Sequence, residues 1–449
     1  MSWSGAAMIA GGFAILLAAQ GHASGLQTPE RIFRQNMSDE GSLIAARVGG
    51  GDGVTVRAAH LACAGCHGGD AAGRTEGGVS APAIDGFRLT KPWGHVFQDG
   101  RRRVPYDAAS FHRALTAGID SSGNRLDASM PRYDISADGS SALFSWLVNL
   151  SSSSTAGVVR VGYPETGTMV DGVDAMRRMI DRVNAEGGIH GRRFELVGVE
   201  AGQSAPQLLA FLCPLPLPLE ESRWRIGKDV LTIGCEVRRE GAGTISYGVL
   251  SSPTARIPVL ETYAKEVLGV SPDRIRVFRS GNEVRSSGAA KVAAPAPLVI
   301  IAERMGEDVR RAVAAAAIEG VRPRLLIAAG ESVVVSGRLP APVGTPPVDI
   351  LAALPLPPDP AGGRGLAARV GAAVTAVFLE AVARAGSDAD TTRVAMQVAR
   401  LSGLRIEGMP VLSFGPGRTY ALTGIHLVAL GGADPAVPSP AAWWYDPDR

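Results

Sequence analysis

The chain has 449 residues, enough for two or three domains, and its 56 Gly and 30 Pro accompany the apolar content of a folded protein. Its 45 Lys and Arg residues nearly balance its 43 Asp and Glu residues, and the formal net charge is +2. This balance gives no electrostatic basis for binding nucleic acid or an anionic membrane, so we expect neither as a partner.

Residues 1–23 resemble a secretory signal peptide. They contain no Lys or Arg, and an apolar run from Ala6 to Ala19 precedes Gly21 and Ala23, which are small residues at the positions that a cleavage site requires. The run is short for a membrane span, although an uncleaved anchor is an open alternative. We expect no other transmembrane segment and a periplasmic location.

The stretch Cys63-Ala64-Gly65-Cys66-His67 reads Cys-x-x-Cys-His, the signature for covalent attachment of a c-type haem. Its spacing lets each thiol add to one vinyl group of the haem and places His67 under the iron as an axial ligand. A bare Cys pair would also suit a redox disulfide or half of a zinc site. The adjoining His and the lack of a second Cys pair nearby in the sequence favour one covalent haem c.

The expected second axial ligand is Met130, which stands beside Pro131 well downstream of the haem motif. A thioether suits haem iron, and ligation by Met and His raises the reduction potential. The alternative is a Met that fills the core, and Met37 is a weaker candidate ligand. Two axial ligands disfavour peroxidase chemistry, and the possible distal bases, His95 and His112, have no supporting motif.

An amphipathic helix with aromatic residues is predicted over 141–150. The order of haem motif, Met loop and closing helix, from 63 to 150, resembles a class I cytochrome c. The resemblance implies an all-α domain, assigned to residues 24–150, that carries single electrons. We expect a loop over 45–56, and a solvated loop at 101–103, where three Arg residues are alternatively a docking site for an acidic redox partner.

Residues 151–157 form a polar Ser- and Gly-containing linker. Beyond the linker, apolar strands alternate with amphipathic helices, which predicts a parallel sheet. Strands are expected over 158–163, 194–197, 230–233, 275–278, 298–302, 325–329 and 424–430, and helices over 169–185, 308–318, 365–385 and 391–401.

Two stretches are characteristic of a family. Residues 184–196 read NAEGGIHGRRFEL, in which glycines allow a left-handed turn at the end of a helix, and residues 408–419 read GMPVLSFGPGRT. On these stretches, residues 157–430 resemble the type 1 periplasmic solute-binding proteins of the branched-chain amino acid class. The resemblance implies a two-lobed α/β domain with parallel sheets, assigned to residues 158–435, and leaves a C-terminal tail over 436–449.

The same resemblance implies that hydroxyl groups at the end of the first strand hold a solute, and Thr166 and Thr168 are the candidates. The next cleft loop offers Cys235 and Glu236, where the family pattern has Gly and Ser or Thr, so ordinary loop residues explain the threonines equally well. An oxidising compartment favours a disulfide between Cys213 and Cys235, although both could instead be small buried side chains.

The sequence therefore predicts a multidomain periplasmic electron-transfer protein, not an enzyme, that contains one haem c. Its expected partners are a dehydrogenase or oxidase and a small solute. The alternative is a ligand-binding or sensor protein of a transport system in which haem is auxiliary, and a further alternative is a second domain that binds nothing. The aromatic residues 443–445 are expected either to contact a partner or to fold back on the domain.

Overall fold

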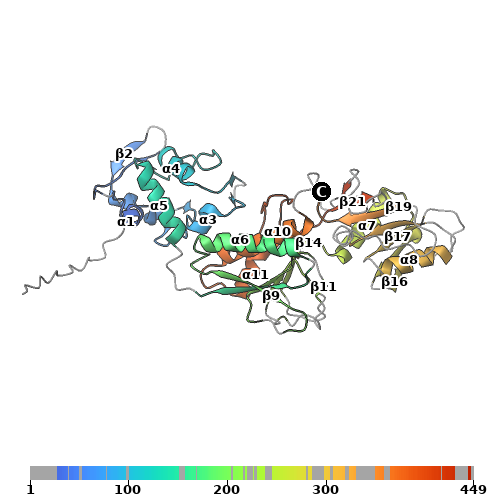
Figure 1. Ribbon diagram of the computed structural model, residues 1–449. Coiled ribbons are helices and arrows are strands. Elements are labelled where there is room, and N and C mark those ends of the chain that lie inside the picture. The colour runs from blue at the N-terminus through green and yellow to red at the C-terminus, as the bar shows by residue number, and fades with distance from the viewer. Residues whose placement is uncertain are drawn as a thin grey trace, which may run out of the picture.

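The structure is a computed structural model. It describes residues 28–38, 40–49, 53–76, 78–97, 101–150, 157–167, 169–203, 206–215, 218–219, 226, 230–237, 245–279, 282–285, 298–303, 307–318, 323–329, 349–357, 365–415, 417–429 and 443–445. The predicted signal peptide and nearly all of the predicted linker lie outside the described residues. Figure 1 shows three bodies in a row: an N-terminal unit (residues 28–150), and then two α/β bodies that we call lobe 1 and lobe 2.

The N-terminal unit packs its longer helices around one apolar core that includes Phe33, Leu115 and Leu147. Helix α4 begins after Asp107, whose carboxylate accepts a hydrogen bond of 2.7 Å from the backbone of Ser110 in a capping box. The unit contains α1 Thr28–Gln35, β1 Ala45–Val48, β2 Val54–Arg57, α2 Cys63–His67, β3 Arg74–Glu76, β4 Val79–Ala81, α3 Gly86–Thr90, β5 His95–Val96, β6 Arg102–Arg103, α4 Ala108–Ala117, β7 Arg132–Tyr133 and α5 Ala137–Asn149.

The all-α prediction for this unit is wrong, as is the predicted loop over 45–56. Strand β1 pairs antiparallel with β2 and with β7 in a three-stranded sheet. The physical reason is tertiary: Ala45 and Ala46 are buried against the core, and β2 then pairs with the other edge of β1. A stretch this short and Gly-rich shows too little periodicity for the sequence alone to reveal its strands.

Lobe 1 is built on a six-stranded sheet in the order β20-β14-β12-β10-β8-β9, in which every pair is parallel. Helices α6 and α10 lie side by side on this sheet (Figure 1). The two helices can approach closely because Gly371 of α10 has no side chain; a Cβ at this position would collide with the backbone of Gly172 in α6. The lobe contains β8 Val159–Pro164, α6 Val170–Ala185, β9 Phe194–Val199, β10 Ala210–Leu212, β12 Leu231–Ile233, β14 Ser246–Leu250, α10 Leu366–Ala385, α11 Thr391–Ala399 and β20 Tyr420–Leu422, with the short pair β11 Pro218–Leu219 and β13 Glu236–Val237.

Lobe 2 has a seven-stranded sheet in the order β16-β15-β17-β18-β19-β21-β22, parallel in the middle and antiparallel at both edges. Val299 and Ile301 of β17 pack with α7, whereas Ile300 and Ala302 pack with α8. Because successive strand residues face opposite sides, the two helices cover opposite faces of the sheet. The lobe contains α7 Pro253–Glu266, β15 Ile275–Arg279, β16 Asn282–Arg285, β17 Val299–Ala302, α8 Glu307–Ile318, β18 Arg324–Ile327, β19 Asp349–Leu354, β21 Ile425–Ala429 and β22 Trp443–Tyr445.

The chain passes between the two lobes three times. It leaves lobe 1 after β14 to form α7, returns after β19 to form α10, and leaves again between β20 and β21. The buried Arg256 braces the first passage, because its guanidinium donates to the carbonyl oxygens of Ser251 and of Ala328, the latter at 2.7 Å. The prediction of an α/β part with two lobes is confirmed. The aromatic stretch of the tail forms the edge strand β22, so its backbone folds back on lobe 2.

Among the described residues, one helix, α10, is long and apolar enough to cross a membrane. Most of it is buried inside the protein, and its side chains Val377, Phe378 and Leu379 belong to the core of lobe 1. Its composition is therefore accounted for by its central position between α6 and α11.

Candidate functional site

Helix α2 consists of the five residues of the haem motif, so the two thiols and the imidazole are placed within little more than one helical turn. His67 is buried, and its Nδ1 lies 2.8 Å from the carbonyl oxygen of Pro82. A carbonyl oxygen can only accept, so Nδ1 is the protonated nitrogen and the lone pair of Nε2 is left for a metal. Burial lowers the pKa of His67, against the opposing effect of the Pro82 carbonyl, which favours the neutral imidazole that ligation needs.

The two thiols differ in environment. Cys66 is exposed, whereas Cys63 is half-buried, and burial raises the pKa of Cys63 to about 11. Both are free in the described structure and lie three positions apart on one helical face. The hydroxyl of Tyr133 lies close by and donates to the carbonyl oxygen of Leu61 at 2.7 Å, which ties β7 to the segment just before α2.

Met130 packs against the same apolar core that Cys63 contacts. Its loop is held by Arg132, whose guanidinium donates to the carbonyl oxygens of Met130, of Leu126 at 3.0 Å and of Asp127 at 3.2 Å. The sequence did not single out Arg132, since an arginine beside a turn carries no distinctive pattern. The arrangement fixes the backbone from which the Met130 thioether extends.

The other sequence candidates have different partners. The sulfur of Met37 lies 3.9 Å from the guanidinium of Arg31, a cationic neighbour that makes it a poorer ligand. His112 bonds to Ser140 at 2.9 Å, which links α4 to α5. Arg103 is buried and donates to the carbonyl of Arg88 at 2.8 Å, so the description of 101–103 as a fully solvated loop is wrong at this position. Its guanidinium supplies hydrogen-bond donors to backbone carbonyl oxygens around it, which accounts for its burial.

These residues fit a covalently attached haem c. Two thiols on one turn, an imidazole whose Nδ1 is engaged by a backbone carbonyl, and a thioether on a braced loop are the donor types that such a group requires. Cys63 and Cys66 would hold the porphyrin, and His67 and Met130 would be the axial ligands.

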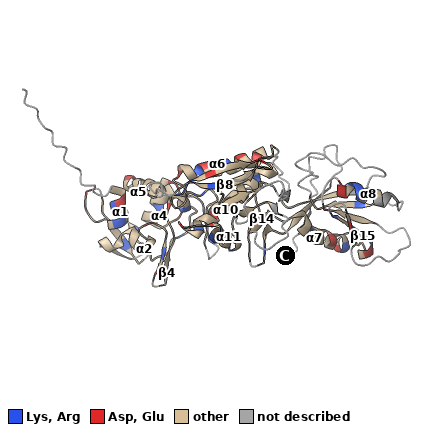
Figure 2. Ribbon diagram, turned by 90° about the horizontal axis from the view of Figure 1, so that it is seen from below, with Lys and Arg blue, Asp and Glu red and all other residues tan. Residues whose placement is uncertain are grey.

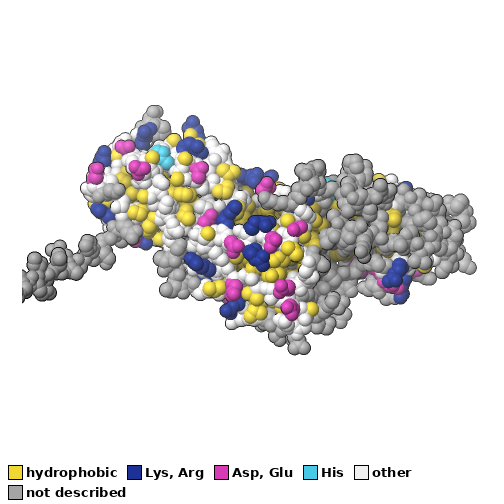
Figure 3. Space-filling model, viewed as in Figure 1, with side chains coloured by type: hydrophobic (Ala, Val, Ile, Leu, Met, Phe, Trp, Pro, Cys, Tyr) yellow, Lys and Arg dark blue, Asp and Glu magenta, His cyan; other side chains and the backbone are white. Residues whose placement is uncertain are grey.

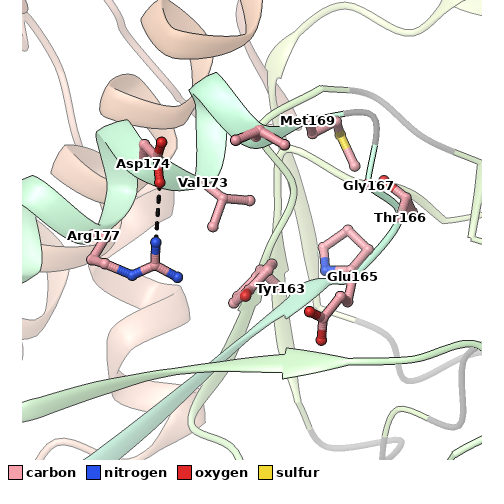
Figure 4. Close-up of a pocket in the computed structure, with 10 residues that line it drawn as sticks. Tyr163, Glu165, Thr166, Gly167, Met169, Val173, Asp174 and Arg177 are labelled. Carbon is pink, nitrogen blue, oxygen red and sulfur yellow. Dashed lines mark hydrogen bonds and ion pairs between the residues drawn. The ribbon is translucent and has the colours of Figure 1, made fainter.

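A second candidate site lies in lobe 1, where a pocket with a volume of about 180 Å³ opens at the carboxyl end of β8. Figure 4 shows Tyr163 and Glu165 on the strand side of the pocket, Val173 on α6, and Met169 in the segment just before that helix. The carboxylate of Glu165 lies against β9 at Gly198, which has no side chain; a Cβ at this position would collide with the carboxylate. The rim also holds an exposed ion pair of 3.0 Å, from Arg177 to Asp174, on α6.

Of the two predicted cleft threonines, Thr166 lines this pocket, and Thr168 lies outside the described residues. The sequence missed Tyr163, Met169 and Val173, which read as ordinary strand and helix residues. Parallel sheets bind ligands at the carboxyl ends of their strands, and this is where the pocket lies.

The next cleft loop of lobe 1 is closed by a disulfide. Cys213 follows β10, Cys235 follows β12, and the bond joins them with Cα atoms 4.9 Å apart. Both side chains are buried, and Glu236 begins the short strand β13. Cys235, one of the two residues at which the sequence departs from the expected Gly and hydroxyl pattern, thus ties the end of β12 to the end of β10.

In lobe 2, Glu303 directly follows β17 and its side chain is only 1% exposed. Its carboxylate accepts a hydrogen bond from Thr254, in the first turn of α7, and lies 3.6 Å from the guanidinium of Arg279 at the end of β15. A buried carboxylate at the carboxyl end of a parallel strand is an anionic group at a ligand-binding position. No sequence pattern points to Glu303 apart from its place after an apolar run.

No family model and no curated protein matches the chain. Several solved structures match it. One is a possible leucine/isoleucine/valine-binding protein from Rhodopirellula baltica, at 13% identity and a TM-score of 0.41, over 65% of this chain and 97% of that one. A leucine-binding protein from Thermotoga maritima is 12% identical, with a TM-score of 0.42, over 66% and 99%. A fatty acid ABC transporter substrate-binding protein from Thermomonospora curvata is 12% identical, with a TM-score of 0.38, over 65% and 93%.

The class of fold follows from the chain's own topology. Two α/β lobes, built on parallel strands and joined by three passages of the chain, define a periplasmic-binding-protein-like fold for residues 157–429. The N-terminal unit with the haem motif precedes this two-lobed part.

Proposed function

We propose that the chain is an exported solute-binding protein of a transport system, whose two lobes hold a small molecule between the carboxyl ends of their strands. The observation that carries this proposal is the threefold passage of the chain between two parallel sheets, with a pocket at the end of β8. The three passages provide a hinge about which the lobes can close on a solute.

The residues at the two strand ends suggest the chemistry of the solute. In lobe 1, the pocket is lined by two residues with hydroxyl groups, Tyr163 and Thr166, together with the apolar residues Met169 and Val173. In lobe 2, the buried carboxylate of Glu303 lies at the end of β17, where it meets Thr254 and Arg279, and we infer that it is the group that a solute contacts when the lobes close. We infer a small molecule with an apolar chain and a cationic group, such as an amino acid. Of the proteins of similar fold, one is described as leucine-binding and another as a possible leucine/isoleucine/valine-binding protein. A fatty acid carries no cationic group and would not meet this requirement.

Titration calorimetry and thermal unfolding of the full chain with leucine, isoleucine, valine and a fatty acid test this proposal. A solute at 100 times its Kd raises the unfolding free energy by about 2.7 kcal/mol. Glu303→Gln should weaken binding of an amino acid by about 10- to 100-fold, because it removes a charge-assisted contact. The matched control is Glu307→Gln, an exposed carboxylate of the same lobe, and it should bind normally. If none of these solutes binds or stabilises the wild type, this choice of ligand class is wrong.

A second function, electron transfer, is favoured by a separate observation, the hydrogen bond from His67 to Pro82. A bound haem would supply a one-electron change between two iron oxidation states. Cys63 and Cys66 would attach it, His67 with its imidazole held by the Pro82 carbonyl would ligate the iron, and Met130 would offer its thioether. A periplasmic dehydrogenase or oxidase would be the redox partner. The two-lobed part would then bind a small molecule or dock the N-terminal unit to that partner.

The surface does not favour a strongly charged redox partner on the face seen in Figure 3, where Lys and Arg side chains are interspersed with Asp and Glu. The peroxidase alternative gains no support either, because His112 bonds to Ser140. A visible spectrum of the periplasmically expressed protein tests the electron-transfer proposal. Haem bands that survive denaturation are expected, and a chain without bound haem would refute it.

A further inference from the structure

Helix α3 of the N-terminal unit packs into the core of lobe 1. Phe87 is 3% exposed and lies within the same apolar cluster as residues of α6 and α10. From the same helix, Arg88 donates to the carbonyl oxygen of Ala383 at 2.7 Å, and Thr90 donates to the carboxylate of Glu186 at 2.6 Å. These contacts join residues far apart in the sequence and from two different bodies.

The centre of this contact is a buried ion pair. The ammonium of Lys91 lies 2.6 Å from a carboxylate oxygen of Glu380, with side chains only 3% and 5% exposed. Trp93 donates to the same oxygen at 3.3 Å, and Arg384 lies 3.0 Å from the other oxygen. Burial alone would raise the pKa of Glu380, but Lys91 and Arg384 hold it at about 2. Separating the two bodies would leave the Lys91 ammonium without its counterpart and would leave Glu380 paired with Arg384 alone.

Helix α3 is also fixed to its own unit. A Cβ at Gly86 would collide with the backbone of Val148 in α5, so α3 lies directly against the closing helix. The carboxylate of Asp85 caps α3 through the backbone of Arg88 at 3.0 Å and pairs with its guanidinium at 2.7 Å. A rigid connection thus runs from α5 through α3 into lobe 1.

The contact lies at the far end of lobe 1 from the solute pocket. The first turns of α6 line the pocket, whereas Glu186, just beyond the last residue of α6, meets α3. With 16 residues, α6 is about 24 Å long. Lobe 1 accordingly separates the N-terminal unit from lobe 2, as Figures 1 and 2 show.

We propose that the N-terminal unit and lobe 1 form one rigid body, docked through α3 and the Lys91–Glu380 pair, so that lobe 2 moves alone when the lobes close. The haem motif then keeps a fixed place relative to lobe 1, and the space between the lobes stays open to solute. The proposal does not depend on which solute, if any, the lobes bind.

The test is to cut the chain and ask whether the bodies stay together. A protease recognition sequence placed within residues 151–156 of the full chain allows the folded protein to be cleaved. Gel filtration at micromolar concentration should then show both fragments in one peak, with the circular dichroism of the uncut protein. Folded fragments that elute separately would overturn the proposal.

Variants of the ion pair make the test specific. Glu380→Met leaves the buried Lys91 ammonium unpaired and should weaken association of the cut fragments by at least about 100-fold. Lys91→Met leaves Glu380 paired with Arg384 and should weaken association less. The double variant removes both charges and should restore association, even where a single variant folds poorly. The control pair is Arg160→Met with Glu195→Met, an exposed pair at 3.1 Å, which should change nothing. Single variants that associate as tightly as the wild type would show that the pair does not hold the bodies together.

Discussion

Removing the disulfide of lobe 1 should cost a predictable amount of stability. The bond between Cys213 and Cys235 closes a loop with a sequence separation of 22. In the chain-entropy description, closing such a loop removes about 11 cal/mol/K from the unfolded state, which is about 3 kcal/mol at 25 °C. The native state needs little adjustment, because both side chains are buried at the ends of β10 and β12, strands that already pair in parallel.

The variant Cys213→Ala with Cys235→Ala should therefore unfold with a free energy about 3 kcal/mol lower than that of the wild type. Urea unfolding of lobe 1, monitored through hydrogen exchange of the β10 and β12 amides, measures this difference in unfolding free energy. Wild-type protein unfolded in the presence of a reductant provides the control and should match the variant. A loss below about 1 kcal/mol would refute the loop-entropy argument and assign the stability of these strand ends to sheet pairing alone.

Three further predictions concern the N-terminal unit and lobe 1. Met130→Ala removes the thioether, so it should convert a six-coordinate low-spin haem spectrum to a high-spin one and abolish the weak Met-to-iron band. A high-spin spectrum in the wild type would contradict Met130 as the ligand. His95 has its pKa lowered to about 3, chiefly by burial and next by Lys91, whereas an unfolded imidazole titrates near 6.5. Between these two pKa values only the unfolded chain binds the proton, so the unfolding free energy falls as pH falls, by about 2 kcal/mol from pH 7 to pH 5. His95→Gln should therefore make the unfolding free energy, measured with urea, depend less on pH. An equal slope in the variant would contradict the assignment. Gly188→Ala should lower the unfolding free energy by about 2 kcal/mol or more, because Gly188 has a φ of +79° and a Cβ there would collide with the carbonyl of Arg192. An unchanged thermal unfolding temperature in this variant would contradict the turn geometry.

The sequence alone predicted those features whose residues are neighbours in the chain. The haem motif falls within one short helix, so its spacing already defines its geometry. The helices α6, α10 and α11 and seven of the fifteen strands that the structure describes in the two lobes were predicted from periodicity to within a few residues, because an amphipathic or apolar run is a local property. The turn at Gly187 and Gly188 was predicted for the same reason, and both have positive φ.

The tertiary structure decided what depends on residues far apart. The strands β1 and β2 form only because β1 has a buried partner surface, and the disulfide was one of two alternatives until the ends of β10 and β12 were placed side by side. The carboxylate of Glu303 meets Thr254 and Arg279 only through the folding of lobe 2.

The contact of the N-terminal unit with lobe 1 shows the difference most clearly. Lys91 and Glu380 are separated by 289 positions, and neither stands in a pattern that differs from a solvated charge on a loop or a helix. Local sequence determines which segments become helices and strands, since that choice depends on neighbouring side chains. Which charges are buried together is decided by tertiary packing, because the low-dielectric interior, absent until the bodies meet, makes an unpaired charge costly.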